Sequence, residues 1–301
     1  MDQPFHTPVL LREAVDALQI VPGGVYVDCT LGGGGHARSI LDALNEKGRL
    51  VAFDQDADAQ RNIPTDKRVA FVNQNFRHLQ KFLRLQNILS VDGILADLGV
   101  SSHQFDSTER GFSTRFNADL DMRMDKRQTL TAKEVIATYS EQQLHKIFEA
   151  YGEVTNAKTL ARTIVAVRDK ISIRSIDDLK NALRGIVKGN PNKYLAQVFQ
   201  ALRITVNDEL GALQELLQQV PVLLKPGGRV AIITFHSLED RLVKHFFRRG
   251  TANEPGQNPF INDEPGNELK AITKKPVIPS EKEIKENPRS RSAKLRVAEK
   301  K

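Results

Sequence analysis

Cysteine is almost absent from this chain of 301 residues, because Cys29 is the only one. A single cysteine excludes an intramolecular disulfide and any metal site built from several thiolates. The chain also lacks a run of about 18 apolar residues, which a transmembrane helix would need. Its first residues have neither the basic start nor the apolar stretch of a signal peptide. We therefore expect a cytoplasmic protein that does not contact a membrane.

Positive charge is concentrated near the end of the chain. The net charge is +7, and Lys270 to Lys301 contain 11 Lys or Arg against 4 Asp or Glu, so the rest of the chain is neutral. Such a basic tail can contact nucleic-acid phosphates by counterion release. No aromatic residue that could stack on a base follows Phe260. A solvated, partly disordered terminus is the alternative, and the sequence leaves both interpretations open.

Apolar runs that end in small or acidic residues predict buried parallel strands whose carboxyl ends form a site. The runs are Val25–Asp28, Leu50–Asp54, Asp92–Asp97 and Arg229–Phe235. Segments of helical period, Ala37–Leu44 and Leu79–Leu85, separate the first three. This alternation of strands and helices indicates an open α/β sheet.

The alternation stops at residues 106–207, where helical patterns begin at capping boxes such as Thr131–Glu134. The sheet pattern resumes with a helix at Glu209–Leu224. We therefore predict an α/β, Rossmann-like fold in which residues 1–105 and 208–301 form one discontinuous domain. Residues 106–207 would form an inserted helical domain. Within the last part, we expect a long loop at 250–288 and an edge strand at Ser292–Ala298.

A run of four glycines, Gly32 to Gly35, leads directly from the first strand into a helix. Glycine lets a backbone come close to a bound cofactor. A P-loop is excluded, because His36 and the residues after it lack the required Lys and Ser or Thr. Asp54 closes the next strand, where an acidic side chain accepts hydrogen bonds from ribose hydroxyls. Both features fit a dinucleotide or S-adenosylmethionine.

The turn Pro226-Gly227-Gly228 precedes the late strand and helps to separate these two cofactors. It is similar to the turn before the fifth strand of Rossmann-like methyltransferases. In sequence order with the glycine run and Asp54, it favours S-adenosylmethionine as the cofactor. A nicotinamide oxidoreductase remains the alternative.

Residues at or just after the strand ends are candidates for catalysis. Asp97 ends the third predicted strand, Ser101 and Ser102 follow it, and all three can accept hydrogen bonds from a target amine. His236 follows the late strand and is expected to point towards the site. A helix cap by Ser237 with Asp240 three residues on is the structural alternative, and it is compatible with a functional His236. Methylation at carbon 5 of cytosine is excluded, because Cys29 lies among the first-strand residues. No cluster of Asp, Glu and His has metal-ligand spacing, so we expect no required metal.

Several longer motifs together resemble one known family over nearly the whole chain. They are His6–Leu11, Gly32–His36, Asp92–Ser102, Arg110–Ser113, Leu120–Asp125, Phe235–Arg241 and Asn287–Ser292. As a set they resemble the ribosomal RNA small subunit methyltransferase H family, also called MraW. The resemblance implies a class I methyltransferase that acts on the exocyclic N4 of one cytidine in the 16S rRNA decoding centre.

The same resemblance assigns the donor-binding residues. It places Gly32, Gly34, Gly35 and His36 along the donor, Asp54 at the ribose, Phe76 beside the adenine, and Asp97 and Gln104 at the remaining contacts. The expected partner is the small ribosomal subunit, with the helical insertion and the basic tail as candidates for RNA contact. The sequence leaves a homodimer open. The main alternative is a non-enzymatic RNA-binding or assembly factor that retains a donor pocket.

Overall fold

The computed structural model describes residues 8–250 and 267–301. The chain divides into two compact units, and each is described by itself. Residues 1–99 and 210–301 belong to the first unit, and Val100–Glu209 form the second. The insertion expected at 106–207 falls inside the second unit. Among the described residues, no helix combines the length and the apolar character that crossing a bilayer requires.

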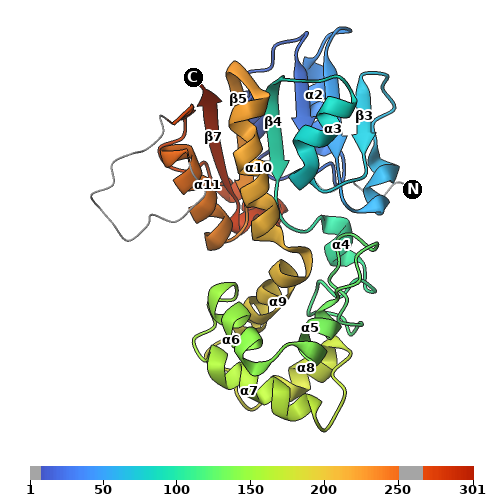
Figure 1. Ribbon diagram of the computed structural model, residues 1–301, viewed down its shortest axis with the longest axis vertical. Coiled ribbons are helices and arrows are strands. Elements are labelled where there is room, and N and C mark those ends of the chain that lie inside the picture. Colours follow the sequence, from blue (N-terminus) through green and yellow to red (C-terminus); the bar gives the residue numbers. More distant parts are fainter. Residues whose placement is uncertain (1–7, 251–266) are drawn as a thin grey trace. The chain divides into compact units, whose positions relative to one another are not determined.

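A seven-stranded sheet in the order β3-β2-β1-β4-β5-β7-β6 organises the first unit (Figure 1). Its strands are β1 (Val25–Asp28), β2 (Arg49–Phe53), β3 (Val69–Val72), β4 (Val91–Asp97), β5 (Leu224–Thr234), β6 (Leu269–Ala271) and β7 (Lys294–Lys300). Strands β1 to β5 pair in parallel, whereas β7 is antiparallel to both β5 and β6. The predicted open α/β sheet is confirmed.

Helices cover both faces of this sheet, because its central strands are apolar on both sides. On one face, α3, α10 and α11 pack against strand residues such as Val27 and Val51. On the other face, α1 and α2 pack against Tyr26 and Leu50. The helical elements of this unit are α1 (Leu11–Ala17), α2 (Gly35–Ala43), η1 (Ala57–Asn62), η2 (Phe76–His78), α3 (Leu79–Leu85), α10 (Glu209–Leu223), α11 (Ser237–Arg249), α12 (Glu281–Glu286) and η3 (Pro288–Ser292).

The second unit is helical, as predicted for the insertion. Its helices are α4 (Ser102–Asp106), α5 (Ala132–Thr138), α6 (Glu141–Ala150), α7 (Ala157–Arg168), α8 (Ile176–Leu183) and α9 (Pro191–Asn207). Capping boxes start α5 at Thr131 and α6 at Ser140. One apolar core, with Phe148 and Leu160 fully buried, holds these helices together.

The last part of the chain differs from its prediction. The segment predicted as an edge strand lies inside the sheet, because β7 pairs with β5 on one side and β6 on the other. The predicted loop at 250–288 contains β6 and α12, while residues 251–266 lie outside the described part. From Leu269 onward the basic tail is folded, so the interpretation as a partly disordered terminus is wrong there.

Part of the positive charge of the tail is neutralised within the first unit. Asp240 of α11 accepts a hydrogen bond from Arg296 at 2.6 Å and one from Lys294 at 3.2 Å, which ties α11 to β7. Burial acts to raise the pKa of Asp240, but the hydrogen bonds from Arg296 and Lys294 outweigh it, so the pKa lies below its ordinary value. Arg296 is only 5% exposed and depends on this partner.

Asp240→Asn is expected to lower the free energy of unfolding at pH 7 by about 3 kcal/mol, because it leaves a buried guanidinium without its counter-ion. Urea titration followed by circular dichroism measures the difference. A carboxylate with a lowered pKa stabilises the fold above its unfolded-state value, and this contribution is lost as the pH falls through the folded-state pKa. The difference in the free energy of unfolding between variant and parent should therefore become smaller at acidic pH.

Glu286→Gln is the matched control, because its pair with Lys282 is largely exposed, at 68% and 84% for the two side chains. Such a pair contributes less than about 1 kcal/mol. Equal losses in the two variants would contradict a structural role for Asp240.

Candidate active site

Three aspartates meet at the carboxyl edge of the sheet. Asp28 ends β1, Asp97 ends β4, and Asp54 directly follows β2. Because β1 lies between β2 and β4 and all three run in parallel, these residues reach the same edge. Open α/β sheets bind their ligands at this edge.

The glycine run between β1 and α2 is shaped by contacts within the chain. Gly32 and Gly34 have positive φ values of 48° and 75°. A Cβ on Gly34 would lie 2.6 Å from the carbonyl oxygen of Asn62, and one on Gly35 would lie 2.0 Å from Cγ of Pro8. Asn62 also donates from its side-chain amide to the oxygen of Gly32 at 2.7 Å. The turn therefore needs glycine for its own packing, in addition to any ligand.

Asp54 holds this turn against β2. Its Oδ2 accepts a hydrogen bond from the backbone N–H of Gly32 at 2.8 Å, and its Oδ1 accepts one from Asp56 at 2.8 Å. A carboxylate has about four acceptor positions. Asp54 can therefore hold the turn and also accept hydrogen bonds from ligand hydroxyls.

Asp28 is completely buried. Its Oδ1 accepts a hydrogen bond from the N–H of Thr30 at 3.0 Å, whereas Oδ2 is buried with no hydrogen-bond partner among the described residues. Burial raises the pKa of Asp28 to about 7, with a further increase from the charge of Asp54 and a partial decrease from the Thr30 hydrogen bond. The carboxyl of Asp28 thus titrates near neutral pH.

Asp97 combines access to solvent with an unpaired oxygen. Its side chain is 23% exposed, yet Oδ1 is buried and has no hydrogen-bond partner in the described part of the chain. Burial raises the pKa of Asp97 well above its ordinary value, and the nearby charges of Asp28 and Glu239 raise it further. Burying such an oxygen costs free energy unless it gains a hydrogen bond, a positive group or a proton.

His36 lies beside Asp97 in its neutral form. Its Nε2 is 3.2 Å from the carbonyl oxygen of Val9, which can only accept, so the proton is assigned to Nε2. Nδ1 then presents its lone pair at 3.8 Å from Oδ2 of Asp97, beyond hydrogen-bond length. Burial lowers the pKa of His36 to about 4. His36 therefore adds no positive charge to this edge at pH 7.

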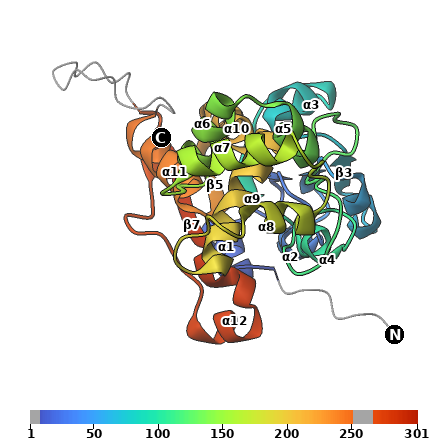
Figure 2. The same ribbon diagram turned by 90° about the horizontal axis from the view of Figure 1, so that it is seen from below.

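Residues 8–10, the N-terminal strap, pack over the start of α2. Pro8 contacts Gly35, Val9 accepts from His36, and the N–H of Leu10 donates to Oε1 of Glu283 at 2.8 Å. Glu283 lies on α12, which is next to α1 in Figure 2. Sequence reasoning missed Glu283, because no local pattern connects residues that are 273 positions apart. His6 and Thr7 of the same motif lie outside the described residues.

His236 is the N-cap of α11, one residue before the predicted cap at Ser237. Its Nδ1 accepts from the N–H of Glu239 at 3.5 Å, and its Nε2 lies 3.2 Å from Oε1 of Glu239. Oε2 of Glu239 accepts from the N–H of Phe235 at 2.8 Å. The capping box therefore uses His236 and Glu239, and the predicted pairing of Ser237 with Asp240 is wrong.

The remaining predicted site residues lie in both units. Phe76 starts η2 in the first unit, half-buried against the core. Ser101 and Gln104 belong to the second unit, where they form the capping box of α4 at 3.0 and 3.2 Å. Ser102 is the first residue of that helix. Cys29 is buried at the end of β1, as expected for a packed residue.

The donor set of the first unit fits one kind of ligand. A glycine turn follows β1, an acid follows β2, and at the end of β4 lies a buried carboxylate oxygen that has no hydrogen-bond partner among the described residues. With β7 antiparallel beside β5, this arrangement defines a Rossmann-like methyltransferase, a class whose methyl donor is S-adenosylmethionine. The model of the MraW methylase family matches residues 3–301, and the chain belongs to that family.

Full-length relatives agree with this membership. The chain is 51% identical over 301 residues to the ribosomal RNA small subunit methyltransferase H of Bacteroides thetaiotaomicron, covering 99% of this chain and 98% of the relative. It is also 51% identical over 300 residues to the protein of the same name from Flavobacterium johnsoniae, with 98% of each chain covered. A crystal structure of an rRNA methylase from Streptococcus thermophilus aligns at 12% identity and a TM-score of 0.41, over 100% of this chain and 98% of that one. The family sets aside the nicotinamide oxidoreductase alternative.

The pKa of Asp28 predicts how stability depends on pH. Between its unfolded-state value of 3.8 and its folded-state value of about 7, the folded chain binds the extra proton. Stability from this group is therefore present at low pH and is lost as the pH rises through 7. Asp28→Asn keeps an acceptor for Thr30 and does not titrate. Its free energy of unfolding relative to that of the parent should therefore be higher at pH 8 than at pH 5. Urea titrations at the two pH values test this, and a constant difference would contradict it.

Glu283→Ala is expected to weaken binding of S-adenosylmethionine about tenfold, because loss of one hydrogen bond to the strap is worth roughly 1.4 kcal/mol. Glu283→Gln keeps an acceptor oxygen and should restore most of the affinity. Isothermal titration calorimetry measures both, with Glu286→Ala on the same helix as the control. An unchanged affinity in Glu283→Ala would show that the strap does not support the donor site.

Proposed function

We propose that the chain transfers a methyl group from S-adenosylmethionine to the exocyclic N4 of one cytidine in the decoding centre of 16S rRNA, in the cytoplasm. The supporting observation is the family match over residues 3–301, together with relatives at 51% identity that are named ribosomal RNA small subunit methyltransferase H. The motifs Asp92–Ser102 and Phe235–Arg241 carry the same resemblance within the described site.

The residues at the carboxyl edge are proposed to bind the donor in distinct ways. Gly32, Gly34, Gly35 and His36 would line it, Asp54 would accept from the ribose hydroxyls, and Phe76 would lie beside the adenine. Gln104 would add a contact from the second unit. When bound, S-adenosylmethionine supplies a methyl group on a positively charged sulfur. The acidic edge formed by Asp28, Asp54 and Asp97 favours such a cation.

Asp97 is proposed as the catalytic residue that contacts the target amine. The lone pair of a cytosine amine is delocalised into the ring, so an acceptor for its N–H makes the nitrogen a better nucleophile. The side chain of Asp97 is 23% exposed, so its carboxylate can fill that role. Its raised pKa also makes it a better proton acceptor than an exposed aspartate when the methylated nitrogen loses a proton.

Ser101, Ser102 and His236 are proposed to have supporting roles. Ser101 is the N-cap of α4 and Ser102 its first residue, four and five positions after Asp97 in the sequence, and both are proposed to help to accept from the same amine. His236 is held by Glu239 and contributes by fixing the loop between β5 and α11. Positioning supplies most of the catalysis in methyl transfer to nitrogen, because the reaction needs only a correctly aligned approach.

The tail is proposed to contact the phosphates of the substrate. Lys270, Lys274, Lys275, Lys285 and Arg291 have exposed side chains, whereas Lys294 and Arg296 pair with Asp240. The exposed cations can release counterions on RNA binding, and those paired inside the unit cannot. Only part of the positive charge of the tail is therefore available for contact with RNA.

A transfer assay tests the proposed function. Labelled S-adenosylmethionine is incubated with the chain and with small ribosomal subunits that lack the modification, and the nucleosides of the product are separated. Label in N4-methylcytidine is the expected result. Absence of label on subunits and on free 16S rRNA alike would overturn the proposal in favour of a binding factor that retains the donor pocket.

Asp97→Asn is expected to lower kcat by about 100-fold or more, because it removes the proton acceptor. Asp42→Asn, on the exposed face of α2, serves as the control and should leave kcat unchanged. Single-turnover measurements at saturating donor separate this effect from weaker donor binding. An Asp97→Asn variant with unchanged kcat and a higher KM for the donor would limit Asp97 to binding.

A further inference from the structure

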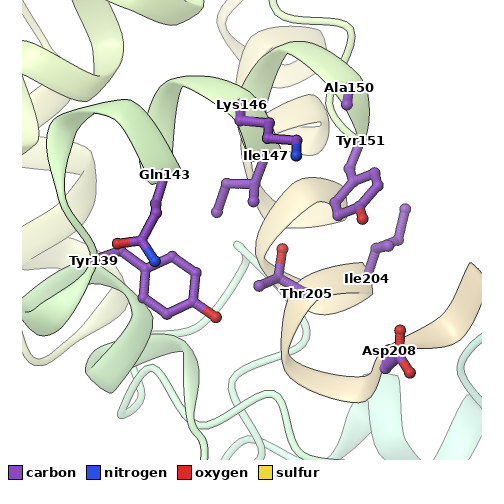
Figure 3. A pocket seen from close by; sticks show the side chains of 9 residues that line it. All are labelled: Tyr139, Gln143, Lys146, Ile147, Ala150, Tyr151, Ile204, Thr205 and Asp208. Atoms are coloured by element: carbon purple, nitrogen blue, oxygen red, sulfur yellow. The ribbon is translucent and has the colours of Figure 1, made fainter. Parts of the chain in front are cut away.

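The second unit contains a pocket that the site above does not use. It has a volume of about 260 Å³ and lies between α6 and α9 (Figure 3). We call it the α6–α9 pocket. Its lining residues are Tyr139, Gln143, Lys146, Ile147, Ala150, Tyr151, Ile204, Thr205 and Asp208. All of them belong to the second unit.

The α6–α9 pocket runs along one face of α6, as the spacing of its lining residues indicates. Gln143, Lys146, Ile147 and Ala150 recur every three or four residues on α6, so they share one side of that helix. Ile204 and Thr205 come from the last turns of α9. Two rings, Tyr139 before α6 and Tyr151 after it, lie at opposite ends in Figure 3.

The lining combines apolar, aromatic and polar side chains, each at a different part of the pocket. Ile147 and Ile204 are buried and give the groove an apolar floor, while the two tyrosine rings are half-buried and keep accessible faces. Gln143 and Lys146 are exposed at the rim, and Asp208 is exposed at the end of α9. The groove thus offers ring faces, hydrogen-bonding groups and one ammonium within a few residues of one another.

We propose that the α6–α9 pocket binds one unpaired nucleotide of the substrate RNA, separate from the nucleotide that is methylated. Unstacked bases bind proteins by stacking on aromatic side chains and by hydrogen bonds along their edges. Tyr139 and Tyr151 supply the stacking faces, Gln143 and Asp208 face the polar edge of the base, and Lys146 neutralises a phosphate. This inference rests on the proposed function, because that function makes RNA the substrate.

Tyrosine fluorescence provides a direct test, because the chain has 4 Tyr and no Trp. Tyr26 and Tyr194 are buried, at 1% and 3% exposure, so Tyr139 and Tyr151 are the tyrosines that a ligand can reach. The probe is a ten-nucleotide oligocytidylate, with a double-stranded RNA of equal length as its comparison. We expect the single strand to quench the fluorescence and the duplex to quench it less, because paired bases cannot enter the groove.

Variants assign the signal to the pocket. Changing both Tyr139→Leu and Tyr151→Leu should weaken binding of the oligonucleotide at least about tenfold, in line with the loss of base stacking. Changing both to Phe keeps the rings and should retain the affinity. Lys146→Gln tests the phosphate contact without touching the core, and Lys158→Gln on the exposed face of α7 is its matched control. Equal affinity in the Leu and Phe variants would overturn the proposal.

The outcomes distinguish this inference from the proposed function. If the Leu variant methylates subunits with an unchanged KM for RNA, the pocket is not an RNA site, although the enzyme assignment stands. If the parent binds oligonucleotide through these tyrosines but transfers no methyl group, the assignment fails while the pocket remains. We expect a raised KM for subunits with kcat at saturation and donor affinity unchanged.

Discussion

The convergence of three carboxylates at one edge of a parallel sheet is the constraint on which the active site depends. Pairing β1 with both β2 and β4 brings Asp28, Asp54 and Asp97 to the same edge, where their charges repel one another. Each is accommodated differently. Asp54 accepts hydrogen bonds from two backbone N–H groups, and Asp28 titrates near neutral pH. Asp97 has one oxygen with no hydrogen-bond partner in the described part of the chain. A positively charged donor bound at this edge, as proposed, would reduce the repulsion between the carboxylates.

The fold was predictable where a strand is long and apolar and ends in an acidic residue. The strands ending at Asp28 and Asp97 were located from their apolar runs, because burial on both faces leaves little polar pattern. β3 escaped prediction, since it has four residues of which only Val72 is buried. β7 was expected at the edge because its alternation does not report how many neighbours it has. The three residues of β6 are too few to give any pattern.

The site was predictable where its chemistry is local in sequence. The glycine run and Asp54 could be read as a donor site because their spacing follows from one strand-helix-strand unit. The sequence did not show why position 35 must be glycine, because that requirement comes from the packing of Pro8 against it. The contact of Glu283 with the strap joins the two ends of the chain, and the capping role of His236 differs from the prediction by one residue. The α6–α9 pocket could not be predicted from the sequence, because residues 139–151 and 204–208, which line it, are far apart in the chain.

Division of the chain into two units suggests how selectivity arises without a sequence-reading motif. In the proposed function, the acidic edge of the first unit would bind the donor, and the carboxylate of Asp97 would accept from the target amine. A second contact on the same RNA, at Tyr139 and Tyr151, would make binding bivalent, so that the second contact forms at a high effective concentration. An RNA that presents an unpaired nucleotide in addition to its target cytidine would gain both contacts. Selectivity of this kind comes from the shape of the folded RNA, and neither contact needs to read more than one base.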